Sequence, residues 1–312
     1  AGVLFTNSSG TSVSNSTFQG TWSGVHVDGG SNHTIKNNVF VDNSGVKMVG
    51  GVPTAVAGAV WVKNASWVKV GYNEIRNTGW PIQNLGVGVL LDTVTDPDVY
   101  QNRISTSGQV GIHLSNGGGS TNTIRSNAIA DNRVYGVWLT NSTGTTVKNN
   151  TISGSITGIY YDPSDHTTIA QNAITGNSGY GIYNVDSSYS HIWGNTLLNN
   201  GTNAYAGASA ANNVWTYAGV GNAWDDFKAN AGYPAQYVVV GPNGESDTHP
   251  EEASTAAKEI GRWSFAEGSG ATLHDETTNH LDGTLANGPA WTSDPEHASV
   301  LDFDGMDDYV DV

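Results

Sequence analysis

Two short sequence patterns recur about every 22 to 23 residues over the first 200 positions, and this repeat limits the folds open to the chain. The first is a small residue, an apolar residue, an aromatic residue or histidine, and a fourth, usually apolar residue, as in Gly136–Leu139 and Gly158–Tyr161. The second places an asparagine among apolar residues at seven positions: Asn38, Asn73, Asn102, Asn127, Asn150, Asn172 and Asn195. Short alternating segments bounded by glycine, asparagine and serine are typical of strands stacked turn upon turn. The sequence therefore predicts an all-β chain in which residues 1–244 form a parallel β-helix of about eight turns.

The repeated asparagines are predicted to be structural. A buried turn must satisfy its backbone polar groups, and an asparagine amide can bond its neighbours and the same residue one turn above and below. Ser16 takes this position in an incomplete first copy, and a further copy is expected at Asn203. We therefore expect a ladder of buried amides with no functional role.

The alternation of strand residues separates inward from outward side chains. In Gly158–Asp162, Ile159 and Tyr161 point inward, and Tyr160 and Asp162 point outward. Applied to every turn, this rule gives one outward column: Leu4, His26, Trp61, Leu90, His113, Trp138, Tyr160, Tyr183 and Tyr205. A second outward column beside it contains Thr6, Asp28, Lys63, Asp92, Ser115, Thr140, Asp162 and Val185.

The first column is predicted to bind a polysaccharide. Exposed aromatic rings at strand spacing make a flat apolar strip on which sugar rings stack, while polar neighbours orient the hydroxyl groups. The substrate-binding residues expected on this basis are His26, Trp61, Trp80, Trp138, Tyr160, Asp162 and Tyr183. Two other interpretations stay open: the rings stack on one another to stabilise the sheet, or a partner covers them.

Two adjacent turns carry long insertions, residues 44–58 and 76–88, which leave the helix on the same side. Long loops on a rigid scaffold often carry binding sites, so the insertions are predicted to form one wall of a groove. Lys63, Asp92 and His113 would lie in that groove, and they are the candidate catalytic residues of a polysaccharide lyase, hydrolase or epimerase.

The spacing of the carboxylates bears on the hydrolase alternative. Asp28 and Asp92 are two strand steps apart on equal stacking, roughly 9.5 Å, which loosely fits the carboxyl pair of an inverting glycosidase. Lys63 between them would lower the pKa of both carboxyl groups. Lys63 is also the one basic residue of the columns, so it is the candidate base of a lyase.

Composition excludes some partners. Twelve basic against 28 acidic residues give a net charge of −16, which disfavours nucleic acid because no basic stripe faces the phosphates. No apolar run is long enough to cross a membrane. The chain has no cysteine and two methionines, and its histidines are not paired at ligand spacing, which disfavours a zinc or copper site.

The repeat resembles the right-handed parallel β-helices of carbohydrate-binding proteins and sugar hydrolases, in the group that includes the NosD-like proteins. The resemblance covers about residues 1–250, with a closing segment from about residue 212 that is expected to cover the last turn. The group contains lyases, hydrolases, epimerases and non-catalytic surface proteins, so it does not decide activity. The "DPSD" sequence from Asp162 is similar to the "DPHD" motif of alginate C5-epimerases, but Ser164 replaces its histidine. The histidine that those enzymes carry one turn further on is absent here as well.

A second module is predicted after a polar linker at 245–259. Residues 260–312, with "WSFAEGSG", "DGTLANGPAW" and "LDFDGMDDYVDV", resemble the start of a laminin-G-like, concanavalin-type jelly roll. The resemblance implies glycan binding, often with calcium, for which Asp304, Asp307 and Asp308 are the candidate ligands; the alternative is that they are turn residues of a hairpin. Such a jelly roll needs more strands than these residues supply, so we expect the chain to be a fragment of a larger protein.

Taken together, the sequence predicts part of a secreted or cell-surface protein whose β-helix binds a polysaccharide. A polysaccharide-processing enzyme and a structural subunit of a filament or spike are the alternatives. In the last case other copies or other parts of the same protein would cover the aromatic column.

Overall fold

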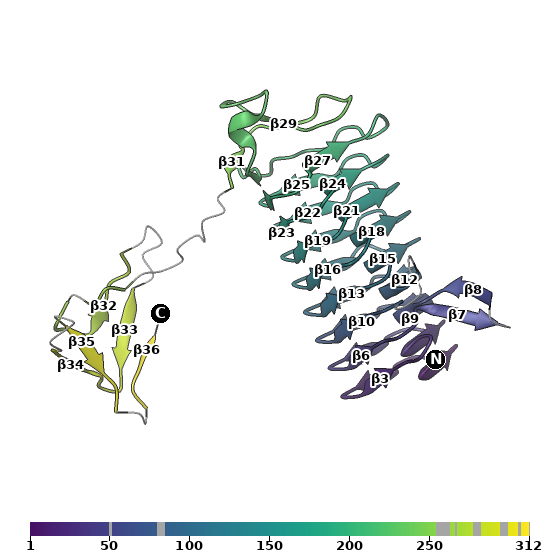
Figure 1. Cartoon of the computed structure of the whole chain (residues 1–312), viewed down its shortest axis with the longest axis horizontal. Helices are drawn as coiled ribbons and strands as arrows, with labels where there is room; N and C mark the ends of the chain where they lie inside the picture. Colours follow the sequence, from purple (N-terminus) through teal and green to yellow (C-terminus); the bar gives the residue numbers. More distant parts are fainter. Residues whose placement is uncertain are drawn as a thin grey trace. The chain divides into compact units, whose positions relative to one another are not determined.

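The computed structural model describes residues 1–49, 52–79, 85–253, 263–265, 267–276, 282–293, 299–304 and 307–311. The chain divides into two compact units, Ala1–Ala253 and Ser254–Val312. Short strands stack in successive turns throughout the first unit (Figure 1). None of the helices in the described ranges is long and apolar enough to cross a membrane.

Three parallel sheets, of nine, eight and ten strands, form the turns of the first unit, so the predicted parallel β-helix is confirmed. The nine-stranded sheet contains, in spatial order, β1 (Val3–Thr6), β4 (Val25–Asp28), β9 (Gly58–Ser66), β12 (Val87–Thr95), β15 (Val110–Ser115), β18 (Tyr135–Thr140), β21 (Thr157–Asp162), β24 (Tyr180–Asn184) and β27 (Thr202–Ala206). The eight-stranded sheet contains β2 (Ser12–Ser14), β5 (Thr34–Lys36), β10 (Lys69–Gly71), β13 (Asp98–Tyr100), β16 (Thr123–Arg125), β19 (Thr146–Lys148), β22 (Thr168–Ala170) and β25 (His191–Trp193). The ten-stranded sheet contains β3 (Thr17–Gln19), β6 (Val39–Val41), β11 (Glu74–Arg76), β14 (Arg103–Ser105), β17 (Ala128–Ala130), β20 (Thr151–Ser153), β23 (Ala173–Thr175), β26 (Thr196–Leu198), β28 (Ala223–Trp224) and β31 (Glu251–Glu252).

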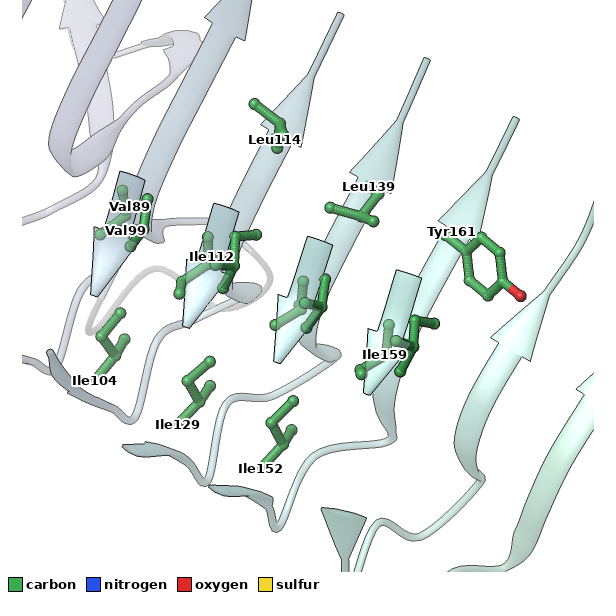
Figure 2. Close-up of a cluster of buried hydrophobic side chains, with 14 of the residues drawn as sticks. Val89, Val99, Ile104, Ile112, Leu114, Ile129, Leu139, Ile152, Ile159 and Tyr161 are labelled. Atoms are coloured by element: carbon green, nitrogen blue, oxygen red, sulfur yellow. The ribbon is translucent and has the colours of Figure 1, made fainter. Parts of the chain in front are cut away.

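The core is built from columns of identical positions in successive turns. Ile104, Ile129 and Ile152 are register partners on the ten-stranded sheet and are buried one above the other (Figure 2). Leu139 and Tyr161 are register partners on the nine-stranded sheet and are fully buried. Because each turn places the same apolar position inward, the core is continuous along the helix axis.

The predicted asparagine ladder is confirmed. Each of the seven asparagines is buried, and the Nδ2 of each donates to the Oδ1 of the next, as from Asn127 to Asn150 at 3.0 Å. The further copy expected at Asn203 is present, because β27 places Tyr205 beside Tyr183, and the residue that follows Asn195 in the ladder is Asn222. Asn203 lies in β27 and its amide instead donates to Asp225 and Asp226. The ladder ends at Asp247, whose carboxylate accepts from the Asn222 backbone at 2.6 Å.

The closing segment covers the last turn with aromatic side chains. It contains the 3-10 helix η1 (Phe227–Ala229) and the antiparallel pair β29 (Tyr237–Val238) and β30 (Ser246–Asp247). Trp224 and Tyr237 are buried and stack with ring centroids 3.9 Å apart. A bridge between Tyr205 and Val240 pairs the last strand of the nine-stranded sheet, so that its edge is not left open.

The two insertions leave the helix from neighbouring turns. The first forms an antiparallel hairpin, β7 (Val46–Val49) and β8 (Val52–Val56), that projects from the side of the helix (Figure 1). At their bases the two insertions touch: a Cβ on Gly45, whose φ is +61°, would lie 2.5 Å from the Cα of Gly86. Part of the second insertion, including Trp80, lies outside the described residues, so its predicted role in a groove wall stays a prediction.

The second unit contains small antiparallel sheets. One joins β32 (Thr272–Leu273), β33 (Gly283–Ala286) and β36 (Tyr309–Asp311), and the other joins β34 (Ala290–Thr292) and β35 (Val300–Asp302). The laminin-G-like assignment of this unit stays a prediction.

Candidate functional site

The predicted aromatic column exists in the predicted register. Successive strands of the nine-stranded sheet pair Leu4 with His26, then in order Trp61, Leu90, His113, Trp138, Tyr160, Tyr183 and Tyr205. The expectation of a flat exposed strip was wrong. His26 and Leu90 are each 8% exposed, and Trp61, His113 and Trp138 are half-buried, because the rings lie face to face and cover one another.

Two parallel stacks of rings organise the first half of the column. His26 and Trp61 lie 4.2 Å apart with planes 2° from parallel, and His113 and Trp138 lie 4.1 Å apart with planes 3° from parallel. Each stack runs along the strand ladder. His26 covers one face of the Trp61 ring, and Trp138 covers one face of the His113 ring. The other face of each ring therefore points toward the strand between them, which carries Leu90.

A hollow of about 330 Å³ lies where the column narrows at Leu90. Its lining residues are Trp61, Leu90, Asp92, Gln109, His113, Ser115 and Trp138. Leucine is shorter than the aromatic residues on either side, so the column is notched at this turn. The Nε1 atoms of Trp61 and Trp138 are buried, so the surface that these rings present is carbon. Asp92 and Ser115 add carboxylate and hydroxyl groups at the rim.

Burial sets the charge of the histidine in this hollow. Loss of solvent lowers the pKa of His113 to about 4, and the negative charge of Asp92 opposes the shift only in part. At neutral pH the imidazole is therefore uncharged, and its Nε2 lies 3.4 Å from the hydroxyl oxygen of Thr140. A neutral ring stacks on an indole and can also accept a proton.

The three predicted catalytic residues fall in neighbouring turns. Lys63 and Asp92 are register partners, and Asp92 and His113 both line the hollow. Lys63 is held by Asp28 at 2.9 Å, and this ion pair lowers the pKa of the Asp28 carboxyl group. Asp92 accepts hydrogen bonds from Thr93 and Asn116.

The second half of the column is a run of tilted tyrosines. Tyr160 and Tyr183 meet at 5.5 Å, edge to face. Burial, with the nearby carboxylate of Asp162, raises the pKa of the Tyr160 phenol to about 12. Burial and the charge of Asp186 raise the pKa of Asp162 as well. These groups offer ring faces and hydrogen-bonding atoms in alternation.

Sequence reasoning missed two tyrosines that widen the column. Tyr135 lies 5.2 Å from Trp138 and 4.7 Å from Tyr160, and Tyr180 stacks on Tyr183 at 4.6 Å. Both precede the glycine that opens the repeated pattern, as "YGVW" and "YGIY". That shared dipeptide is the signal that could have identified them.

The predicted calcium ligands do come together in the second unit. One carboxylate oxygen from each of Asp304, Asp307 and Asp308 lies within 4.8 Å of the others. The backbone nitrogen of Asp304 donates to Asp308 at 3.0 Å, as expected for a turn. The geometry suits either of the two interpretations from the sequence, and calcium binding stays a prediction.

Comparisons with known proteins agree with the repeat. The family described as "Periplasmic copper-binding protein (NosD)" matches residues 1–120 and 59–229. A crystal structure of the periplasmic alginate epimerase AlgG, in a mutant form, is similar with a TM-score of 0.50 and 15% identity, over 65% of this chain and 49% of that one. The Dettilon tailspike protein (gp208) gives a TM-score of 0.36 and 16% identity, over 72% of this chain and 54% of that one. The chain thus spans about half the length of each. No curated protein matches it.

The copper in the family's description does not fit the residues described here. Across the described ranges, one set of three potential ligands converges, and it consists of carboxylates alone: Asp304, Asp307 and Asp308. Carboxylate oxygens suit calcium or magnesium better than copper. His113 is stacked on an indole, and His33 is buried between Thr11 and the carbonyl oxygen of Gly29.

Proposed function

The chain belongs to the NosD family, and from the geometry of its aromatic column we propose that it binds a polysaccharide along the nine-stranded sheet, with one sugar ring held in the hollow over Leu90. The observation that carries the proposal is the pair of ring faces, from Trp61 and His113, on the two sides of this residue. The strands that carry them are two steps apart, about 9.6 Å.

A sugar ring fits this spacing. A ring stacked between two aromatic faces, at about 4.5 to 5 Å from each, needs about 9 to 10 Å between them. The C–H faces of the sugar would meet the carbon surface of Trp61 and the uncharged ring of His113. Asp92 and Ser115, at the rim, would take hydroxyl groups that project from the ring. Tyr160 and Tyr183 would continue the contact along a longer chain.

Filling the hollow tests the proposal. In Leu90→Trp an indole would occupy the gap, as aromatic rings do in the flanking turns, so the fold should be kept while affinity for the bound polysaccharide falls at least about tenfold. Affinity is measured by calorimetry, with a ligand first chosen from a panel of neutral and acidic polysaccharides. Leu4→Trp is the matched control, since Leu4 has the same column position at the far end and is exposed.

The results separate the alternatives. An equal loss of polysaccharide affinity in Leu90→Trp and Leu4→Trp, or no loss in either variant, would contradict the hollow as the binding site. New reducing ends or unsaturated uronates in the same mixtures, abolished by His113→Ala or Asp92→Asn, would favour a polysaccharide-processing enzyme. Self-association that Trp138→Ala or Tyr160→Ala prevents, without any glycan binding, would favour the structural subunit.

Two further parts of the proposal concern location and the second unit. The family's description as periplasmic supports a place outside the cytoplasm, in the periplasm or at the cell surface. For Ser254–Val312 we propose the start of a laminin-G-like module; the antiparallel pairing of β33 with β36 is compatible with it.

A further inference from the structure

A second hollow, of about 480 Å³, lies on the eight-stranded sheet and not on the aromatic column. Strands β10, β13, β16 and β19 form its floor. The lining residues that matter for binding are Trp67, Lys69, Asp96, Asp98, Arg125 and Lys148. Asp96 fixes one wall, because its Oδ1 accepts hydrogen bonds from Ser120 and Thr121 in the loop that follows β15.

Three cations gather here in a strongly acidic chain. Arg125 makes a two-point contact with Asp98, at 2.9 and 2.8 Å, and its guanidinium lies 4.6 Å over the Tyr100 ring. Within the described ranges, Lys69 and Lys148 have no carboxylate at ion-pair distance. They stand on strands three steps apart, about 14 Å, with the Arg125–Asp98 pair between them. Two ammonium groups therefore remain open to an anionic ligand.

Trp67 supplies a ring face in an unfavourable backbone position. Its φ is +51° and its side chain is 58% exposed. Asn32 and Asp96 in the same hollow also have positive φ and tolerate it, whereas the exposed Tyr72 and Tyr189 are bulky residues with positive φ at other corners. A bulky residue there costs of order 1 kcal/mol or more. The exposed indole of Trp67 therefore gives the hollow an open apolar ring face.

We propose that this hollow binds a carboxylated saccharide, of the uronate class, with its ring on Trp67 and its carboxylates at Lys69 and Lys148. Asp96 and Asp98 would accept hydrogen bonds from hydroxyl groups, and they would repel a ligand with dense charge such as a polyphosphate. The hollow thus suits a ligand with many hydroxyl groups and widely spaced negative charges. This site does not depend on the column, since it lies on another sheet.

The test uses trigalacturonate, its methyl ester and the same full chain at low salt. Binding of the acid is expected, with affinity at least about tenfold lower for the uncharged ester and falling further as salt rises. Lys69→Met with Lys148→Met should reduce affinity for the acid at least about tenfold. Lys36→Met is the matched control: Lys36 lies on the same sheet but does not line the hollow, so affinity should stay within about twofold.

Trp67→Asn tests how much the indole ring contributes to binding, in a variant whose folding stability should be kept. Asparagine suits a positive φ, so the melting temperature should not fall, while affinity for trigalacturonate drops about tenfold. Leu90→Trp should leave this affinity unchanged even where it abolishes binding at the column. The proposal is overturned if the ester binds as tightly as the acid, if Lys36→Met weakens binding as much as the double variant, or if Leu90→Trp removes trigalacturonate binding.

Discussion

Asn150→Ala is expected to lower the free energy of unfolding by about 3 to 5 kcal/mol. The Asn150 amide donates to the carbonyl oxygens of Ile124 and Lys148 and to Oδ1 of Asn172, at 3.0 Å each. Its own Oδ1 accepts from the backbone and the side chain of Asn127. Alanine would leave several of these groups without a partner in a site that is 1% exposed, and each buried unpaired group costs about 1 to 3 kcal/mol.

The position of this residue makes the effect larger than at a surface asparagine. Each turn contacts only its neighbours, so loss of one amide in the middle weakens the interfaces on both sides. Urea unfolding followed by circular dichroism measures the change. Thr151→Ala is the control, since Thr151 is exposed beside Asn150 and should cost less than about 0.5 kcal/mol. A loss below about 1 kcal/mol for Asn150→Ala would show that the ladder does not stabilise the helix.

The register of the column could be predicted because two independent signals agree. A strand alternates with period two, and the buried asparagines fix how one turn aligns with the next. Trp61, Leu90 and His113 therefore had to fall on neighbouring strands in one row. Neither signal reports how far a side chain extends or whether its faces are covered.

The two hollows depend on just those properties. The first arises because Leu90 is short between rings that are already stacked, which a list of outward residues treats as one more apolar position. The second brings Trp67 and Lys69 together with Arg125 and Lys148, which lie at least 56 positions further along the chain. Arg125 and Lys148 share one row of register partners, and Lys69 lies in another. The repeated aromatic pattern lies on the nine-stranded sheet, whereas this hollow lies on the eight-stranded sheet.

Acid is expected to destabilise the chain through His113. In the unfolded chain a histidine has a pKa near 6.5, whereas burial lowers the pKa of His113 to about 4. Between these two pH values the unfolded state therefore binds a proton on His113 that the folded state does not bind. The contribution of this residue is complete above about pH 6.5 and is lost as the pH falls toward 4. At about 1.4 kcal/mol for each pH unit between the two pKa values, the loss is about 3 kcal/mol.

His113→Phe isolates this contribution, since phenylalanine keeps a ring on Trp138 and cannot titrate. Urea unfolding of both proteins between pH 7.5 and about pH 4 should show a steeper fall for the unchanged chain. Carboxylates titrate in both proteins, and so does His33, whose pKa burial also lowers, so their effects cancel in the difference between the two curves. Parallel curves would mean that His113 is open to solvent. The hollow over Leu90 would then lack the uncharged ring face on which the stacking of a sugar depends.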